Sequence, residues 1–367
     1  MGFKCGIVGL PNVGKSTLFN ALTRTAAAQA ANYPFCTIEP NTGEVAVPDP
    51  RMQKLASVAG SKEIIPTRIS FVDIAGLVRG ASKGEGLGNK FLANIREVDA
   101  IVHVLRCFED DDITHVEGRI DPVSDADTIE TELMISDLES LERRTEQTRK
   151  RAASKDKDSM TVLPIMEAAL KLLQDGKPVR TLLKTLAPEE LEILKGLNLL
   201  TSHPVLYVCN VSEADAATGN AHTEAVAKMA AEQGAESIVI SAAIESEVAQ
   251  LPDEESKEFL AALGLEEAGL DRLIRAGYHL LDLITYFTVG PKETRAWTIE
   301  RGTKAPAAAG VIHTDFERGF IRAFTIAYDD YVTLGGEVPA KEAGKARDEG
   351  KEYVVQDGDV IHFRFNT

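Results

Sequence analysis

The eight residues Gly9–Ser16 constrain the fold of this chain more than any other segment. They fit the pattern GxxxxGK[ST], and they lie between an apolar run, Lys4–Val8, and a helical pattern that begins near Lys15. Glycines let such a loop curl until its backbone N–H groups point inward at phosphate oxygens. The following helix directs the positive end of its dipole at the same anion. The order strand, loop, helix therefore predicts a site for the phosphates of a nucleotide.

Lys15 and Ser16 carry the side-chain chemistry expected of this loop. The ammonium group of Lys15 neutralises charge on the β- and γ-phosphates and so contributes to catalysis, while the hydroxyl of Ser16 binds Mg²⁺. The remaining contacts to the nucleotide are predicted from the rest of the loop and the first helical turn, at Asn12, Val13, Gly14 and Thr17.

Two further segments supply candidates for the metal site. Asp73 follows the apolar run Ile69–Val72, and a carboxylate at the end of this strand suits Mg²⁺ binding through a water molecule. The N–H of Gly76 can reach the γ-phosphate. Thr37 lies in a loop after the first helix, where its hydroxyl can reach Mg²⁺ when the loop closes, as in a nucleotide-dependent switch. An ordinary loop threonine and a strand-ending aspartate are the simpler interpretations of Thr37 and Asp73.

Leu77 follows Gly76, at the position where Ras-like GTPases carry a glutamine that orients the attacking water. A leucine side chain cannot hydrogen-bond to water. Either another group positions the water, or hydrolysis is slow until a partner contributes.

The segment after the apolar run Val205–Cys209 bears on the choice of base. Guanine-specific relatives carry Asn-Lys-x-Asp here, whereas this chain has Asn210, Val211 and Glu213. The extra methylene of Glu213 disturbs pairing with guanine, and Val211 removes the lysine that shapes the base site. Asn210 can still offer its amide to adenine N6 and N7, so the altered motif favours ATP over GTP. A second loop, predicted to contact the base through backbone N–H groups, comprises Ser241, Ala242 and Ala243. Generic turns at strand ends are the alternative for both segments.

Apolar, β-rich runs alternate with helical patterns along two stretches of the chain. Continuous apolar runs with helices between them are typical of a parallel sheet covered on both faces. The alternation predicts a doubly wound α/β domain. Its expected strands are Lys4–Val8, Ile69–Val72, Ala100–Leu105, Val205–Cys209 and Ser237–Ile240.

Three helical patterns separate the third and fourth of these runs, at Thr128–Ala152, 161–174 and Glu189–Leu200. They predict an antiparallel helical hairpin inserted into the α/β domain. Acidic residues interleave with the basic residues near its tip, so a solvated charged face is one interpretation and a contact surface for RNA phosphates is the other. The basic residues are Arg143, Arg144, Arg149, Lys150, Arg151, Lys155 and Lys157.

After about residue 283 the pattern changes to short strands. Apolar segments at Tyr286–Gly290, Arg295–Ile299, Phe324–Ala327 and Val360–Phe365, with a helix start at Ala305, predict a small α+β domain.

Composition narrows the functional classes. The 367 residues carry a formal net charge of −17, which argues against nonspecific binding to nucleic acid, DNA included. A nucleoprotein can still be bound through a local basic face. No run of about 18 apolar residues indicates a membrane span, and the N-terminus lacks the layout of a signal peptide. Four scattered cysteines without metal-ligand spacing fit reduced thiols in a cytoplasmic protein.

Together with the phosphate loop, several longer motifs resemble the YchF/Obg-like ATPase family, within the Obg-related, translation-factor-type P-loop proteins. They are NYPFCTIEPN at 32–41, DIAGLVRGASKGEGLGN at 73–89, NVSE at 210–213, RAWTI at 295–299 and IHTDFERGFIRA at 312–323. The resemblance covers nearly the whole chain. It implies a Ras-like P-loop NTPase core (1–125 and 201–283), an inserted antiparallel, coiled-coil-like helical arm (126–200) and a C-terminal TGS domain of β-grasp type (284–367).

The resemblance also implies an activity. It implies a ribosome-associated ATPase that prefers ATP to GTP and acts as a switch in translation or stress response. The implied partner is the large subunit or the whole ribosome, through rRNA and ribosomal proteins. Two rival functions stay open: a GTPase with relaxed base selection, and a nucleotide-stabilised binding adaptor whose turnover is incidental.

Three more residues acquire interpretations at this point. The resemblance places at His115 the group that replaces the missing glutamine, and at Asn12 a ligand for K⁺, whose charge can substitute for an arginine finger. A surface histidine and a turn-stabilising asparagine are the alternatives. His103 lies within an apolar strand and is predicted to be a hydrogen-bonded core histidine.

Overall fold

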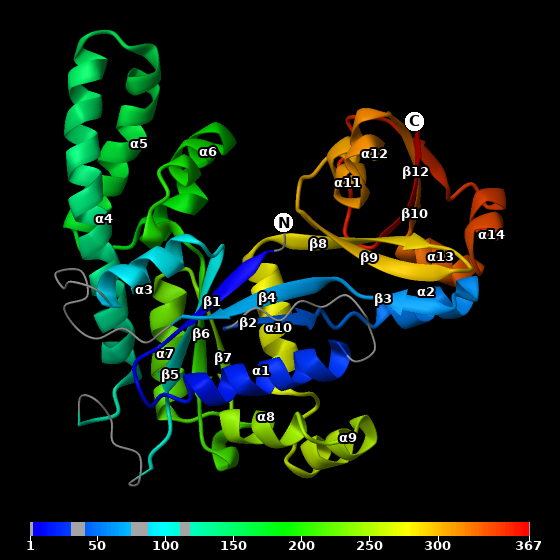
Figure 1. Ribbon diagram of the computed structural model, residues 1–367, viewed down its shortest axis with the longest axis horizontal. Coiled ribbons are helices and arrows are strands. Elements are labelled where there is room, and N and C mark those ends of the chain that lie inside the picture. The colour runs from blue at the N-terminus through cyan, green and yellow to red at the C-terminus, as the bar shows by residue number, and fades with distance from the viewer. Residues whose placement is uncertain (1–2, 31–40, 75–86, 111–117, 367) are drawn as a thin grey trace. The chain divides into compact units, whose positions relative to one another are not determined.

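The computed structural model describes residues 3–30, 41–74, 87–110 and 118–366. They form two compact units (Figure 1). The first unit comprises Met1–Val45 and Ser70–Leu273, and the second comprises Ala46–Ile69 and Ile274–Thr367. The sequence prediction assigned all of residues 1–125 to the nucleotide core. In the structure, residues 46–69 leave that core and belong to the second unit.

A six-stranded sheet forms the centre of the first unit. Strand β1 lies between β4 and β5 and is parallel to both, and β6 and β7 continue the parallel arrangement beyond β5. The predicted parallel α/β fold is confirmed, and β2 is an additional edge strand that the apolar pattern did not reveal. The order is β2 (Thr42–Ala46), β4 (Arg68–Asp73), β1 (Lys4–Val8), β5 (Ala100–Arg106), β6 (Val205–Asn210) and β7 (Glu236–Ile240).

The central strands have long apolar runs because both of their faces are covered. Every residue of β5 and β6 is buried, as are four of the five residues of β1. Helices lie on both faces of the sheet (Figure 1). They include α1 (Lys15–Ala30), α3 (Leu87–Arg96) and α7 (Ala221–Glu232). Helix α8 (Ala242–Val248) packs against α1, α9 (Asp253–Ala262) packs against α8, and α10 (Gly269–Leu280) continues into the second unit.

A helical arm is inserted between β5 and β6. Helix α4 (Pro122–Ala153) and helix α5 (Lys157–Gln174) run side by side, and each begins at an aspartate whose side chain accepts a hydrogen bond from a backbone N–H three residues on. Helix α6 (Pro188–Gly196) follows, and the 3₁₀ turn Leu200–Ser202 replaces the end of the predicted third helix. The arm has its own apolar core: Leu141, Ile165, Met166, Ala169, Leu173, Val179, Leu194, Leu197 and Leu199.

The second unit contains a mixed six-stranded sheet. Its pairs are antiparallel except for β12 with β8 and β3 with β9, which are parallel. Helices α11 (Ala305–Ile312), α12 (Thr314–Arg318), α13 (Tyr328–Leu334) and α14 (Glu337–Glu342) connect the strands. The order is β11 (Arg347–Glu349), β10 (Phe320–Ala327), β12 (Asp359–Phe365), β8 (Leu283–Val289), β9 (Glu293–Glu300) and β3 (Glu63–Ile65).

The segment 46–69 contributes both apolar and polar contacts to this unit. Helix α2 (Arg51–Ala59) buries Met52 and Leu55 in one cluster with Phe287 and Tyr331. At its start, Arg51 donates to the carboxylate of Asp49 and, through Nη1, to Oδ2 of Asp357 at 2.7 Å.

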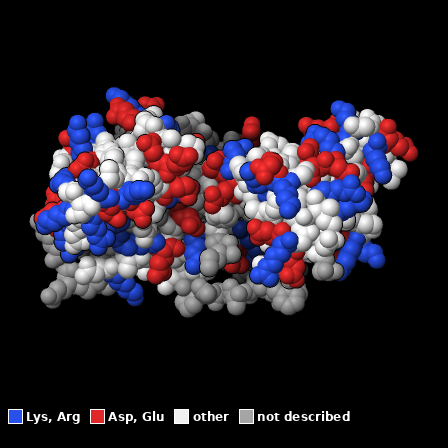
Figure 2. All heavy atoms as spheres, turned by 90° about the horizontal axis from the view of Figure 1, so that it is seen from above, with Lys and Arg blue, Asp and Glu red and all other residues white. Residues whose placement is uncertain are grey.

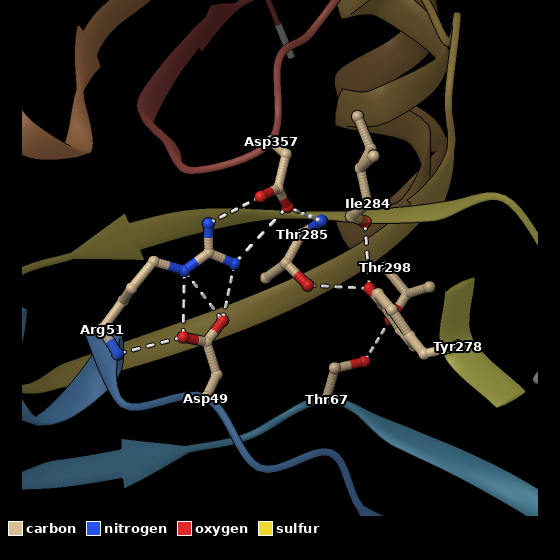
Figure 3. Close-up of polar contacts among 8 residues, drawn as sticks. All are labelled: Asp49, Arg51, Thr67, Tyr278, Ile284, Thr285, Thr298 and Asp357. Atoms are coloured by element: carbon tan, nitrogen blue, oxygen red, sulfur yellow. Dashed lines mark hydrogen bonds and ion pairs between the residues drawn. The ribbon is translucent and has the colours of Figure 1, made fainter. Parts of the chain in front are cut away.

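These polar contacts continue toward strands β8 and β9 (Figure 3). Oδ1 of Asp357 accepts a hydrogen bond from the backbone N–H of Thr285 at 2.9 Å. The hydroxyl of Tyr278 is 2.7 Å from that of Thr285, and Thr67 is hydrogen-bonded to Thr298. Contacts between residues more than 200 positions apart therefore fix this segment, which explains why a local pattern did not assign it.

Among the described residues, no helix is both long enough and apolar enough to cross a membrane.

Replacing Leu55 with alanine tests the membership of this segment. Leu55 is fully buried, so the cavity left behind is expected to destabilise the second unit by about 2–5 kcal/mol. Hydrogen exchange of the intact chain should show faster exchange in β8 and β12. The matched control is Lys54→Ala on the exposed side of the same helix. Faster exchange confined to β1 and β5 would contradict the assignment.

Candidate functional site

The phosphate loop connects β1 to α1 and contains two residues with left-handed backbone. Asn12 has φ 64° and Gly14 has φ 90°. A Cβ atom at Gly14 would stand 2.1 Å from Nδ2 of Asn210, so a side chain is excluded by space as well as by backbone conformation. Helix α1 then begins at Lys15, with the N–H of Leu18 donating to the carbonyl of Gly14.

Asn210 connects this loop to a second loop at the same edge of the sheet. Its Nδ2 donates to the carbonyl of Val13 at 2.9 Å, and its Oδ1 accepts from the N–H of Ala242 at 2.9 Å. The side chain is almost completely buried. The sequence prediction directed this amide to adenine, whereas the structure uses its oxygen and one N–H within the protein. The structure uses the second N–H of this amide in no hydrogen bond with another described residue.

These loops surround a cavity of about 1030 Å³. It brings together residues predicted from three separate segments, together with a wall from the end of β5. Its lining comprises Leu10, Pro11, Asn12, Gly14, Lys15, Ser16, Thr17, Phe108, Glu109, Asp110, Asn210, Val211, Ser212, Glu213, Ala214, Ala242 and Ala243.

Ser241 differs from its neighbours in that second loop. It precedes α8, and its hydroxyl is buried without a hydrogen-bond partner among the described residues. Ser241 and Val13, both predicted to contact the nucleotide, are absent from the lining of the cavity.

Lys15 and Asp73 meet at the edge of the site. Nζ of Lys15 donates to Oδ1 of Asp73, and both side chains are largely shielded from solvent. No group of three His, Cys, Asp or Glu side chains in the described ranges is arranged to hold a metal ion. A hydroxyl at Ser16 and one carboxylate fit Mg²⁺, which keeps several waters and takes its other ligands from nucleotide phosphates.

The wall formed by Phe108 and Asp110 was missed by the sequence analysis. Arg106, the last residue of β5, is buried and donates to the carbonyls of Phe108 and Asp110 at 3.2 and 3.1 Å. Its guanidinium carbon also lies 4.7 Å from the centre of the Phe108 ring. An arginine at the end of a buried, largely apolar strand was the available signal, because a buried cation requires partners nearby.

Four predicted residues lie outside the described ranges: Thr37, Gly76, Leu77 and His115. Their proposed contacts are expectations from sequence.

His103 is a core residue of β5 and does not line the cavity. Burial, with the nearby positive charge of Arg180, lowers the pKa of its imidazole to about 3, so the ring is neutral at physiological pH. Its ring centre lies 5.6 Å from that of Tyr207. Its Nε2 has no hydrogen-bond partner among the described residues, which differs from the predicted hydrogen-bonded state.

Comparison with known proteins supports one family over the full length. The chain is 60% identical to the Ribosome-binding ATPase YchF of Haemophilus influenzae and 55% identical to that of Escherichia coli O157:H7, in each case across all of both chains. The chain belongs to the YchF family. A YchF-type C-terminal family model, described as a protein of unknown function, matches residues 283–366, and one described as a 50S ribosome-binding GTPase matches residues 4–152.

Solved structures agree with this membership. The structure of the Schizosaccharomyces pombe YchF GTPase is 40% identical, covers 99% of this chain and 98% of its own, and has a TM-score of 0.89. A GTP-binding protein from Pyrococcus horikoshii, 19% identical over 99% of this chain and 100% of its own, has a TM-score of 0.62 and shows the fold alone.

Replacing Asn210 tests whether it organises the YchF nucleotide cavity. Asn210→Ala leaves the carbonyl of Val13 and the N–H of Ala242 without partners, and each such loss costs about 1–3 kcal/mol. We expect lower stability in denaturant without nucleotide and at least tenfold weaker ATP binding by calorimetry.

The matched control is Thr201→Val at the root of the arm, where a buried hydroxyl bonded to Asp137 is removed. It should lower stability without changing the affinity for ATP. Unchanged affinity in Asn210→Ala would show that the two loops hold their positions without this side chain.

Proposed function

We propose that this chain is a ribosome-associated ATPase that hydrolyses ATP to ADP and phosphate as a nucleotide-dependent switch in translation or stress response. The observation that carries the proposal is the shared cavity: the phosphate loop and the Asn210–Glu213 segment line one space and are joined by Asn210. Relatives at 55–60% identity are named ribosome-binding ATPases.

The base site supports ATP over GTP. Val211 is buried and its N–H donates to the carbonyl of Ile240, so it fills the place where guanine-specific relatives carry lysine. Glu213 is exposed on the rim of the cavity, and its longer side chain fits guanine N1 and N2 poorly. Phe108 offers an aromatic face to either purine.

The proposed ligands of Mg²⁺ are Ser16, Thr37 and, through a water molecule, Asp73. When it is bound, the ion neutralises charge on the phosphates. Lys15 contributes a fixed positive charge beside it. The N–H groups of Val13, Gly14, Ser16, Thr17 and Gly76 are proposed to orient the phosphates. Asn12, which lines the cavity with left-handed backbone, is the proposed ligand for K⁺.

His115 is the proposed group that orients the attacking water, because Leu77 cannot. A neutral imidazole accepts one hydrogen bond and donates another, which suits this task.

The arm is the proposed contact to the ribosome, an association in the cytoplasm that involves neither membrane nor DNA. Figure 2 shows Lys and Arg side chains over the arm, interleaved with Asp and Glu. Two basic residues of the arm already have partners within the protein: Arg149 forms an ion pair with Glu167, and Arg144 donates to the carbonyl of Leu197. Arg151, Lys155 and Lys157 form no ion pair with other described residues. The name of the family model that matches 4–152 favours the large subunit.

Two alternatives remain distinguishable by experiment. The S. pombe relative is described as a GTPase, which supports the alternative of a GTPase with relaxed base selection. Leu77 supports the alternative of an adaptor with incidental turnover, because a leucine side chain cannot orient the attacking water.

Calorimetric titration of the nucleotide-free protein with ATP and with GTP, each with Mg²⁺, tests the base assignment. We expect ATP to bind at least tenfold more tightly, a difference of about 1.4 kcal/mol. Glu213→Asp, alone and with Val211→Lys, should move the preference toward GTP, whereas the exposed control Glu247→Asp should leave it unchanged. Equal affinities in the unaltered protein would favour the GTPase alternative.

His115→Ala tests the hydrolytic step and the switch together. The variant should bind ATP normally, lose single-turnover hydrolysis and stay with sedimenting ribosomes in ATP, as the unaltered protein does with a non-hydrolysable analogue. Hydrolysis by the unaltered protein should be faster in K⁺ than in Na⁺. Intact hydrolysis would exclude His115, and ribosome binding that ignores the nucleotide would favour the adaptor.

A further inference from the structure

A second cleft lies wholly within the second unit, between α12 and the end of β12. It has a volume of about 640 Å³, within the range of small-ligand sites. The side chains that matter here are those of His313, Asp315, Phe316, Arg318, Phe365 and Asn366. None of them lines the nucleotide cavity of the first unit.

The floor of this cleft depends on a close approach of two backbones. A Cβ atom at Gly319 would stand 2.0 Å from the carbonyl oxygen of Asn366, so any side chain there would push the end of β12 away. The N–H of Asn366 donates to the carbonyl of Gly319 at 2.8 Å, and the N–H of Gly319 donates to that of Asp315 at 2.9 Å. These hydrogen bonds hold the residues at the end of β12 against the end of α12.

Two aromatic rings stand at the centre of the cleft. Phe316 and Phe365 stack with ring centres 3.7 Å apart and an interplanar angle of 24°. Phe316 packs against the apolar core of the unit, and both rings remain partly exposed. A rigid aromatic pair that is supported from below and open to solvent offers a flat face for another ring.

Hydrogen-bonding groups of both kinds surround this pair. Nδ1 of His313 accepts from the N–H of Asp315 at 3.2 Å and also lies 3.4 Å from Oδ2 of Asp315, so Nε2 is the ring nitrogen that can face a ligand. Asp315 supplies carboxylate acceptors, and Asn366 supplies an amide with a donor and an acceptor. This combination matches the edge of a nucleobase.

One basic residue of the cleft, Arg318, can meet an anion beside that base, while Asp315 gives the same cleft one negative charge. Arg318 is exposed and forms no ion pair with another described residue. The second unit balances 16 Lys and Arg against 16 Asp and Glu, so the first unit carries the whole net charge of −17. Figure 2 shows charges of both signs interspersed over the second unit. A polyanion therefore meets no net repulsion from this unit.

We propose that this cleft binds an unpaired nucleotide of single-stranded RNA. The base stacks on the exposed face of the Phe316–Phe365 pair, its edge meets His313, Asp315 and Asn366, and Arg318 contacts the adjoining phosphate. An apolar peptide would leave this ring of polar groups unpaired, and duplex RNA would not present a base to the stack. The proposal concerns a site that the ATPase reaction does not use.

Fluorescence anisotropy of the full chain with fluorescein-labelled single-stranded RNA hexamers tests it. ADP and Mg²⁺ are present in excess, so that the nucleotide cavity is filled. Phe365→Leu removes the stacking face and should weaken binding at least tenfold, whereas Phe365→Trp keeps an aromatic face and should stay within about threefold. Arg318→Gln should weaken binding and lower the salt dependence by about one phosphate contact. The control Arg301→Gln, in the same unit and paired with Asp282, should change nothing.

Three outcomes would overturn the proposal. The first is that the unaltered chain shows no binding to RNA, and the second is that Phe365→Leu binds RNA as tightly as the unaltered chain does. Third, if nucleoside monophosphates displace the labelled RNA as effectively as unlabelled RNA does, the occupant is a free nucleotide. Ribosome binding that falls in Phe365→Leu without any change in RNA affinity would instead indicate a protein contact. If Phe365→Leu fails to fold, Phe365→Trp and Arg318→Gln carry the test. ATP hydrolysis should be unchanged in every variant, so failure here is separate from failure of the ATPase assignment.

Discussion

The two hydrogen bonds of the Asn210 side chain hold the nucleotide site together. They join the carbonyl of Val13 in the phosphate loop to the N–H of Ala242 at the start of α8. Parallel strands deliver their loops to one edge of a sheet, but they do not by themselves fix the distance between those loops. A buried amide with one donor and one acceptor engaged fixes that distance, and Gly14 has no side chain because the amide occupies the space.

A second set of buried polar contacts relates the arm to this sheet. Arg180, at the root of the arm, forms a bidentate pair with Glu130 of α4 at 3.0 and 2.6 Å and donates to Gln233, which also accepts from Tyr207 of β6. Buried ion pairs contribute little net stability, but breaking one leaves a costly unpaired charge. The network therefore specifies how the arm leaves the core more than it stabilises the core. Because β6 ends at Asn210, the strand that meets this network also carries the link to the phosphate loop.

The parts of the molecule that short-range sequence patterns encode could be predicted from the sequence. Five parallel strands were predicted because their two buried faces require continuous apolar runs, and the phosphate loop was predicted because few other loops need its glycines. The strand β3 and the helix α2 were not assigned to the second unit, because their partners lie more than 200 residues away along the chain. The wall at Phe108 was missed for a related reason: only the fold shows that the guanidinium of Arg106 turns back to hold that loop against the cavity.

Because charge is distributed unevenly, the two units differ in how strongly they repel the phosphate backbone of ribosomal RNA. Attraction and repulsion between exposed charges fade over about 8 Å at physiological salt, so the net charge of −17 on the first unit acts mainly on what approaches that unit closely. A phosphate backbone is repelled from most of its surface and tolerated where unpaired basic residues gather, as at Arg151, Lys155 and Lys157 of the arm. The second unit carries no net charge and opposes no such approach. The contacts with RNA proposed for the arm and the second unit therefore lie where the net charge of the chain opposes a phosphate backbone least.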